Sequence, residues 1–264
     1  MERIPVLNVE NLSVSFSQYA GVLRKKQIEA IKDLNVTLYP GEIVAVAGAS
    51  GSGKSLLAHA ILGILPYNAS MGGRISYCGN SLTSAQAQEL RGKEIVLVPQ
   101  SVSYLDPLMK VGPQIRKNAK DKPSREKTLE IFNRYGLAAE TENLYPFELS
   151  GGMARRVLIS TAVLEKPKLV IADEPTPGLD AAAAKRVMEH FREIADEGAA
   201  VLLITHDLEL AIETADRIAI FYAGTTLEEV QASDFAEGLK LHHPYTRALW
   251  QAMPRNGMQV PKGI

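Results

Sequence analysis

The sequence has only one cysteine, Cys78, among its 264 residues, which excludes an intrachain disulfide and any metal or iron–sulfur site built from several cysteines. It also lacks an excess of charge of either sign. The 29 Lys and Arg residues and the 30 Asp and Glu residues give a net charge of −1. No global basic field therefore favours nucleic acid, and we expect no nucleic-acid partner.

Long apolar segments are missing as well. The initial sequence MERIPVLNVE has no apolar signal-peptide core, so we expect the chain to remain in the cytoplasm. The uncharged segment 55–73 approaches membrane-spanning length, but it contains His59, Pro66 and Asn68. A spanning helix needs about 20 mainly apolar residues. If this protein acts at a membrane, we expect it to do so through partner proteins.

The sequence does contain a regular alternation of apolar runs and helical patterns. Near-continuous apolar runs predict buried parallel strands at 42–48, 94–99, 168–173, 200–205 and 217–222. Helical patterns lie between them, at about 54–65, 153–165, 180–196 and 208–214. This alternation predicts an α/β fold with a central, mostly parallel sheet. Before it, segments 6–16 and 28–42 are typical of an antiparallel pair of strands, with a turn at Pro40–Gly41.

The apolar runs that indicate strands are not found between residues 101 and 150. Segment 123–137 places Leu129, Ile131, Phe132 and Tyr135 at near-helical spacing, which predicts a helical insertion. We therefore expect residues 1–264 to form a single domain with three parts. These are a core (1–100 and 163–224), a helical insertion (101–162) and a C-terminal tail (225–264).

The sequence GASGSGKS at 48–55 fits the phosphate-loop pattern G-x-x-x-x-G-K-[ST], with a predicted strand before it and a predicted helix after it. Glycines permit a left-handed backbone and close approach to phosphate, and the N-terminus of the helix attracts anions. Lys54 should reach the β- and γ-phosphates, and the Ser55 hydroxyl should bind Mg²⁺. The nucleotide-binding residues predicted here are Gly48, Ser50, Gly51, Ser52, Gly53, Lys54, Ser55 and Leu56.

Polar residues stand at three further strand ends. In KLVIADEP, Asp173 is placed to support the Mg²⁺ shell, and Glu174 is then free to orient and deprotonate a water aimed at the γ-phosphorus. Gln100 and His206 directly follow two other predicted strands. Because ligands bind at the carboxyl ends of the strands in open parallel sheets, we expect both side chains to face the same site.

A second anion-binding turn occurs in LSGGMARRV at 149–157, where Ser150, Gly151 and Gly152 stand ahead of an arginine pair. With it, the motifs resemble the ATP-binding subunit of an ABC (ATP-binding cassette) transporter in identity and order. The sequence elements that carry the resemblance are the phosphate loop, Gln100, LSGGM (149–153), LVIADE (169–174), GLD (178–180) and TH (205–206). The resemblance covers about residues 6 to 250. It implies a P-loop NTPase cassette with an N-terminal antiparallel β subdomain and a helical signature subdomain. It also implies ATP and Mg²⁺ as cofactors and ATP hydrolysis coupled to transmembrane transport.

The resemblance also implies why one chain carries two anion-binding turns. Two such subunits pair head to tail, so Ser150, Gly151 and Gly152 would close over the γ-phosphate bound by the partner. The residues whose roles rest on the resemblance are Asp180 at the dimer seam, His206 at the γ-phosphate, Gln100 as a catalytic and metal-binding side chain, and Phe16, or alternatively Tyr19, against adenine.

Three sequence features are similar to one branch of the family, the peptide/nickel importers. They are Met153 in the signature, QSVSYLDPLMKVGPQI (100–115) and HHPYTRALWQAMP (242–254). Many peptide-type members continue further, some with a cysteine cluster, so this shorter sequence looks more like nickel or metal-chelate subunits, and peptide import stays open. We expect His242 and His243 to cap and pack rather than to bind nickel.

The resemblance implies two integral membrane permeases, a second ATPase subunit and an exported substrate-binding protein as partners. The second ATPase is either a copy of this chain or, as we expect, a different subunit. The chain would then lie at the cytoplasmic face of the cell membrane as a peripheral protein. The alternatives are export instead of import, a soluble ABC ATPase that remodels cytoplasmic machinery, and a nucleotide-binding regulator without turnover.

Overall fold

The structure is a computed structural model that describes residues 3–20, 24–49, 51–117, 121–164 and 166–256. Within these residues the strands form one sheet in the order β5-β4-β1-β2-β10-β9-β3-β8-β7-β6. Their bounds are β1 (Leu7–Ala20), β2 (Arg24–Leu38), β3 (Ile43–Ala47), β4 (Ala69–Tyr77), β5 (Asn80–Ser81), β6 (Ile95–Val98), β7 (Leu169–Asp173), β8 (Ala200–Thr205), β9 (Arg217–Tyr222) and β10 (Thr225–Gln231).

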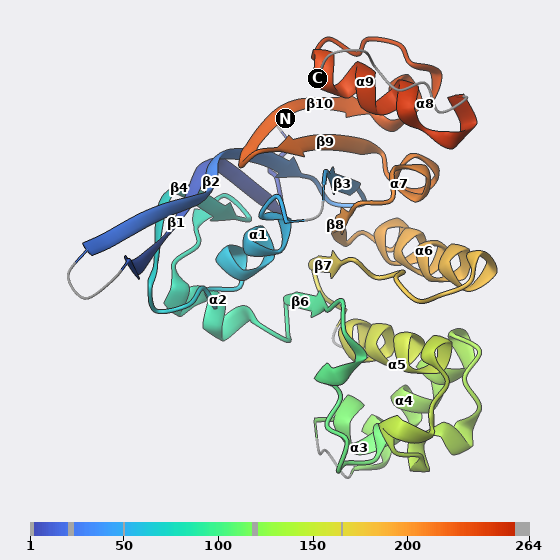
Figure 1. Cartoon of the computed structure of the whole chain (residues 1–264). Helices are drawn as coiled ribbons and strands as arrows, with labels where there is room; N and C mark the ends of the chain where they lie inside the picture. Colours follow the sequence, from blue (N-terminus) through green and yellow to red (C-terminus); the bar gives the residue numbers. More distant parts are fainter. Residues whose placement is uncertain (1–2, 21–23, 50, 118–120, 165, 257–264) are drawn as a thin grey trace.

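The helices lie on both sides of this sheet (Figure 1). They are α1 (Lys54–Ile61), α2 (Ser84–Leu90), α3 (Val111–Ile115), α4 (Lys122–Arg134), α5 (Gly151–Val163), α6 (Ala181–Asp196), α7 (Leu208–Thr214), α8 (Ala232–Glu237) and α9 (Pro244–Ala252). Short 3-10 turns are η1 (Val102–Tyr104), η2 (Ala139–Asn143), η3 (Pro146–Glu148) and η4 (Pro254–Asn256). No helix in the described part of the chain is both long enough and apolar enough to span a bilayer.

The predicted parallel core is confirmed. Strands β6, β7, β8, β3 and β9 run parallel to one another, and each differs from its predicted range by at most one residue at either end. Side chains of β3 alternate between two apolar clusters, with Ala45 on one face and Val44 and Val46 on the other. Both faces are therefore covered, which explains why these segments are apolar along their whole length.

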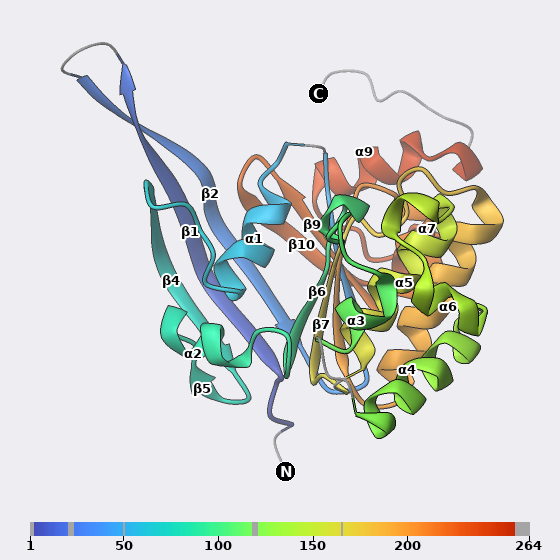
Figure 2. The same cartoon turned by 90° about the horizontal axis from the view of Figure 1, so that it is seen from below.

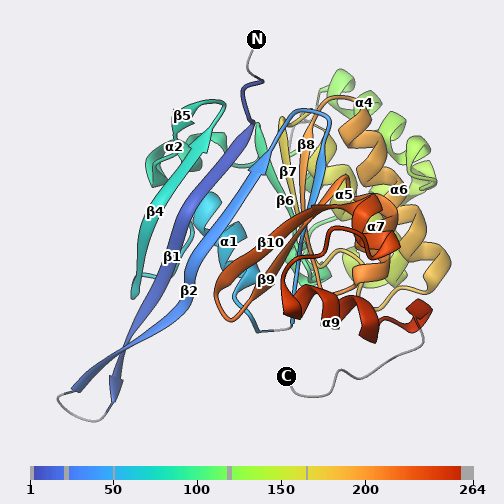
Figure 3. The same cartoon turned by 90° about the horizontal axis from the view of Figure 1, so that it is seen from above.

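The antiparallel pair is also confirmed. Strands β1 and β2 pair from Leu7↔Leu38 to Ala20↔Arg24, and β4 joins the other side of β1. The predicted turn occurs at Pro40–Gly41, where Gly41 has a φ of 78°. Figures 2 and 3 show α1 between these antiparallel strands and the parallel strands, with α4 to α7 on the opposite face. Helix α1 thus packs in one apolar cluster with β1, β2, β4 and one face of the parallel strands.

Helices α3, α4 and α5 fill the interval between β6 and β7, where the helical insertion was expected. The predicted helix at 123–137 corresponds to α4, and it buries Phe132. Tyr135, directly after the helix, is 1% exposed. The tail is more regular than the sequence indicated, because β10 pairs antiparallel with β9 and is followed by α8 and α9. The exact division into core, insertion and tail stays a prediction.

Glu142 links the parts of the helical insertion. It is 5% exposed and forms ion pairs with Arg116, next to α3, and Arg125, on α4. The distance from Arg116 Nη1 to Glu142 Oε2 is 3.0 Å. The Arg125 side chain, helped by Arg116, holds the pKa of Glu142 below its ordinary value of 4.5. A carboxylate shared by two guanidinium groups joins three segments that are separate in sequence.

Replacing Glu142 with Gln should lower the free energy of unfolding at pH 7 by about 2–3 kcal/mol, since the half-buried Arg116 loses its partner while Arg125 stays in water. Because the folded-state pKa of Glu142 is depressed, this stabilisation is present above pH 4.5 and is lost as the pH falls below it. Denaturant unfolding at pH 7 and at pH 3 should therefore show a difference between wild type and variant that shrinks in acid. Glu140→Gln, in the same 3-10 turn but exposed, is the control. Equal stability of both variants at pH 7 would contradict this role.

Candidate active site

The phosphate loop connects β3 to α1, and its glycines are required for two different reasons. Gly51 and Gly53 have φ values of 76° and 98°, which other residues rarely adopt. Gly48 is required by packing, because a Cβ there would lie 2.0 Å from the carbonyl oxygen of Phe221 in β9. Ser50, also predicted to bind nucleotide, lies outside the described residues.

The loop holds Lys54 as a buried ammonium group. Lys54 is 4% exposed, and its Nζ donates to the carbonyl oxygens of Gly48 and Ala49, both at 2.9 Å. Burial lowers the pKa of Lys54, and the nearby carboxylates Glu174 and Asp173 oppose this effect. The ammonium group therefore lies inside the loop with only backbone carbonyls as hydrogen-bond partners among the described residues.

Two observations show that the loop fits a phosphate group. The buried Ser52 hydroxyl oxygen has no hydrogen-bond partner among the described atoms, and a buried polar atom of this kind calls for a ligand or water. At the start of α1 no side chain caps the helix among the described residues, because Gly53 occupies the capping position. The first N–H groups of the helix are thus available to an anion.

Asp173 ends β7 next to the start of α1. Its Oδ1 accepts a hydrogen bond from the Ser55 hydroxyl at 3.1 Å, and the residue is 8% exposed. Burial raises the pKa of Asp173, the Ser55 hydrogen bond opposes this, and Glu174 adds to it. A hydroxyl and a carboxylate oxygen side by side form the hard donor set that Mg²⁺ prefers. The residues present therefore fit a magnesium ion.

Glu174 lies at the centre of the polar cluster. Its Oε2 accepts from Gln100 Nε2 at 2.8 Å, and its Oε1 lies 3.2 Å from His206 Nδ1. The three residues follow β7, β6 and β8, which are adjacent in the sheet. The backbone of Glu174 is left-handed, with a φ of 44°, and its N–H donates to the carbonyl oxygen of Ile204 at 2.8 Å. The structure thus brings together all three side chains that were predicted to be catalytic.

Other predicted site residues lie apart from this cluster. Ser150 begins α5, where its Oγ accepts from the backbone N–H of Met153 at 3.3 Å. Asp180 begins α6 in the same way, with its Oδ1 accepting from the N–H of Ala183 at 2.8 Å. Among the residues that the structure describes, a Cβ added at Gly151 or at Gly152 would meet nothing within 4 Å. Both helix starts are therefore open to a ligand or partner from outside this chain.

The predicted adenine contact has less support from the packing. Phe16 in β1 is partly buried and packs against the apolar cluster that includes α1, as Leu56 does. The side chain of the alternative residue, Tyr19, lies outside the described side chains. The role of either aromatic ring stays a prediction.

Two contributors to the site were not predicted. Ala49 contributes a carbonyl oxygen to Lys54, and Arg155 donates to the carbonyl oxygens of Pro99 and Gln100, both at 2.7 Å. Every residue has a backbone carbonyl oxygen, so the sequence could not indicate the contact between Ala49 and Lys54. The sequence shows the arginine pair that follows the signature, but it does not indicate which carbonyl oxygens these arginines contact.

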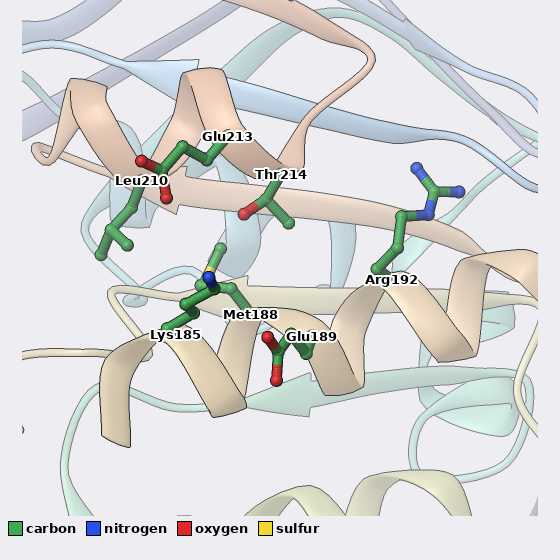
Figure 4. Close-up of a pocket in the computed structure, with 7 residues that line it drawn as sticks. All are labelled: Lys185, Met188, Glu189, Arg192, Leu210, Glu213 and Thr214. Atoms are coloured by element: carbon green, nitrogen blue, oxygen red, sulfur yellow. The ribbon is translucent and has the colours of Figure 1, made fainter. Parts of the chain in front are cut away.

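The surface cavities coincide only in part with the position of the predicted site residues. A cavity of about 540 Å³ lies beside His206 and is lined also by Gly178 and Leu179. A small groove of about 130 Å³ lies between α6 and α7 and is lined by Met188 and Leu210 among others (Figure 4). Because ligand pockets usually have 300–1,000 Å³, this groove is too small for a nucleotide. It contains none of the predicted site residues.

A phosphate loop, a carboxylate pair after β7 and an LSGG helix start on one mixed sheet define the class of ATP-binding cassettes. Comparison with known proteins agrees. A sequence profile of the family described as "ABC transporter" matches residues 31–177. The dipeptide transport ATP-binding protein DppD of Bacillus subtilis (strain 168) is 36% identical over 97% of this chain and 79% of its own length. The oligopeptide transport ATP-binding protein OppD of Escherichia coli (strain K12) is 35% identical over 95% of this chain and 76% of its own length.

The fold is similar to that of solved cassettes. The dimeric post-hydrolysis state of the ATP-binding cassette MJ0796, bound to ADP and Pi, has a TM-score of 0.72 and 25% identity, over 86% of this chain and 98% of that one. A nucleotide-free cassette from an ABC transporter has a TM-score of 0.75 and 23% identity, over 92% and 97%. This chain belongs to the ABC transporter family. It binds ATP and is an ATPase whose hydrolysis is coupled to transmembrane transport.

Proposed function

We propose that this chain energises the import of small peptides as one of two ATPase subunits of a membrane transporter. The relatives of known cargo support peptides, since they are named for dipeptide and oligopeptide transport. The cargo favoured by the sequence, nickel or a metal chelate, has no support from these two relatives. The contacts of His242 and His243 are structural. The backbone N–H groups of both residues donate to the Glu228 carboxylate, and the His243 side chain caps the start of α9.

The observation that carries the enzymatic proposal is the meeting of Gln100, Glu174 and His206 at three adjacent strand ends beside the phosphate loop. Glu174 accepts the proton of a water molecule as that water attacks the γ-phosphorus and the bond to the ADP oxygen breaks. Gln100 and His206 hold the carboxylate in position. Lys54 binds the phosphates. Ser55 and Asp173 would hold Mg²⁺, which would supply positive charge next to the phosphate oxygens. Gln100 is the further proposed metal contact.

The permease partners would bind beside η1. Tyr104 and Leu108 are 66% and 88% exposed, and Val102 is 39% exposed. Apolar side chains gathered in one surface segment indicate a protein interface. We infer that residues 101–110 face two integral membrane permeases, which places the chain on the cytoplasmic face of the membrane as a peripheral subunit. An exported binding protein would deliver the cargo.

The signature helix supports a shared nucleotide site. Gly151 and Gly152 have ordinary φ values, and a Cβ at either position would meet no atom of the described residues within 4 Å. Neither turn geometry nor internal packing therefore requires glycine there. We infer that close approach of an external group requires it, and that this group is the γ-phosphate bound to the phosphate loop of the second ATPase. Asp180 would lie at the seam between the two subunits.

Replacing Gly151 with Ala should leave this chain as stable as wild type or up to about 1 kcal/mol more stable, because Ala favours the first helical turn. ATP hydrolysis in the assembled transporter should nevertheless fall about 10-fold or more, since the added methyl group keeps the backbone N–H groups from the phosphate. Thermal unfolding of the isolated chain and steady-state hydrolysis of the complex measure the two effects. Loss of nucleotide binding by the isolated variant would contradict the shared-site arrangement, as would a normal rate in the complex.

The test of the whole proposal is an affinity pull-down of this chain from detergent-solubilised native membranes, read by mass spectrometry. We expect two multi-span permeases, an ATPase and an exported binding protein. The recovered binding protein can be assayed with di- and oligopeptides, nickel and metal chelates, so that binding of metal alone would overturn the peptide cargo. Recovery of soluble partners only would favour the cytoplasmic remodelling ATPase instead.

A further inference from the structure

Arg155 carries a buried guanidinium group without a carboxylate partner. The residue lies on α5 and is 4% exposed, and it forms no ion pair with any carboxylate of the described residues. Burial lowers the pKa of Arg155. Its Nε has no hydrogen-bond partner among the described atoms. A buried charge of this kind is costly to a fold, and the hydrogen bonds made by its two Nη atoms compensate that cost only in part.

The hydrogen bonds of the Arg155 side chain go to the two residues that directly follow β6. Nη1 donates to the carbonyl oxygen of Pro99 and Nη2 to that of Gln100, both at 2.7 Å. The side chain of Gln100 donates in turn to Glu174 at 2.8 Å. A continuous series of hydrogen bonds therefore runs from the candidate base, through the side chain and backbone of Gln100, to α5.

Helix α5 carries this link to the other anion-binding turn. It begins after Ser150, and the carbonyl oxygen of Ser150 accepts from the N–H of Ala154 at 2.9 Å, one residue before Arg155. The next residue, Arg156, is directed elsewhere. It donates to the carbonyl oxygens of Tyr135 and Gly136, at the end of α4, at 3.1 and 2.9 Å. The two arginines thus fix the same helix to two different segments.

We propose that Arg155 is a positioning residue that couples the two nucleotide sites served by one chain. It would transmit a displacement of the Gln100 backbone, in this chain's own ATP site, to the start of α5, in the site of the second ATPase. The rigid guanidinium fork, with one donor on each carbonyl, allows little relative motion between the two segments. The idea rests on the proposed function, because only a shared site gives the start of α5 a nucleotide to contact.

Hydrogen exchange of the full-length isolated chain, with and without Mg²⁺ and the slowly hydrolysed analogue AMP-PNP, tests the coupling. In the wild type we expect the analogue to change exchange at residues 48–57, at 99–105 and at 149–157. In Arg155→Gln, whose side chain is shorter and has no guanidinium fork to span the two carbonyls, the changes at 48–57 and 99–105 should persist. The change at 149–157 should be lost. Since the readout is local, it does not depend on the cargo.

Arg156→Gln is the matched control, because it removes hydrogen bonds from the same helix but none from residues 99–100. It should keep the response at 149–157. Arg155→Lys, whose ammonium group can donate to both carbonyls, should restore part of it. Arg155→Met is a second variant, which removes the buried charge and leaves the two carbonyl oxygens without their Arg155 donor. It should lose the response as Arg155→Gln does.

A response at 149–157 that survives in Arg155→Gln and Arg155→Met would overturn the proposal. So would the absence of that response in the wild type, or its equal loss in Arg156→Gln. A wild-type chain in which AMP-PNP leaves even residues 48–57 unchanged would count against the nucleotide site itself, which is a failure of the proposed function rather than of the coupling.

Discussion

Glu174→Gln is expected to bind ATP as tightly as the wild type and to hydrolyse it at least about 100-fold more slowly. General base catalysis contributes roughly 10²–10⁴-fold to a rate, and a carboxamide cannot accept the proton of the attacking water. The geometry of the site should survive. The amide oxygen can still accept from Gln100, and the amide nitrogen can face His206, whose Nδ1 is a donor or an acceptor according to its tautomer.

Single-turnover hydrolysis of γ-labelled ATP and equilibrium binding of ATP measure the two properties separately. Glu189→Gln, on the exposed face of α6, removes the same charge far from the cluster and should behave as the wild type. A wild-type rate in Glu174→Gln would remove Glu174 from the role of general base. Loss of ATP binding would show instead that its charge serves to hold the site together.

Lys54→Met is expected to weaken ATP binding by about 3 kcal/mol, roughly 100-fold, because a buried cation that meets phosphate is removed. The fold should not suffer. The ammonium group is 4% exposed and donates to the carbonyl oxygens of Gly48 and Ala49, so an apolar side chain of similar length replaces a buried charge without breaking an ion pair. The pKa of Lys54, lowered mainly by burial, agrees with this cost of desolvation.

Ligand-dependent unfolding measures the effect. At an ATP concentration 100 times the wild-type Kd, the wild type should gain about 2.7 kcal/mol of stability and Lys54→Met about 0.4 kcal/mol. Lys26→Ala, an exposed lysine on β2, is the control. An unchanged gain in Lys54→Met would contradict the placement of Lys54 at the phosphates, and a large loss of stability without ATP would contradict the view that its charge is a burden to the fold.

The parallel core was predictable because its strands are buried on both faces and are therefore apolar along their length. The strands β4 and β10 were not predicted. Their sequences, ASMGGRISY and TTLEEVQ, are half exposed and contain glycine or acidic residues, so neither alternation nor an apolar run marks them. Strand β4 is held in the sheet by β1, which is distant in sequence, and β10 is held by β9, which it joins through a short turn. Pairing of this kind leaves little trace in the strand itself.

The candidate site also has features that the sequence could predict and features that it could not. Gln100, Glu174 and His206 could be predicted to converge because each directly follows a parallel strand, and such strand ends share one edge of the sheet. The close contact of Gly48 with Phe221 could not, because it joins two backbones. The same holds for the contacts of Arg155, whose acceptors are carbonyl oxygens that every residue carries.

The left-handed backbone of Glu174 has an evolutionary consequence. A φ of 44° costs a glutamate about 1 kcal/mol or more, whereas Gly or Asn would adopt it with less strain. Selection for hydrolysis therefore keeps at this position a residue that the fold itself disfavours. In a duplicated gene whose product no longer needs to turn over ATP, replacing Glu174 with Gly or Asn would relieve this backbone strain. The stability of the fold thus favours the change from two active ATPase subunits to one active and one inactive subunit. Only the need for ATP hydrolysis in transport opposes this change.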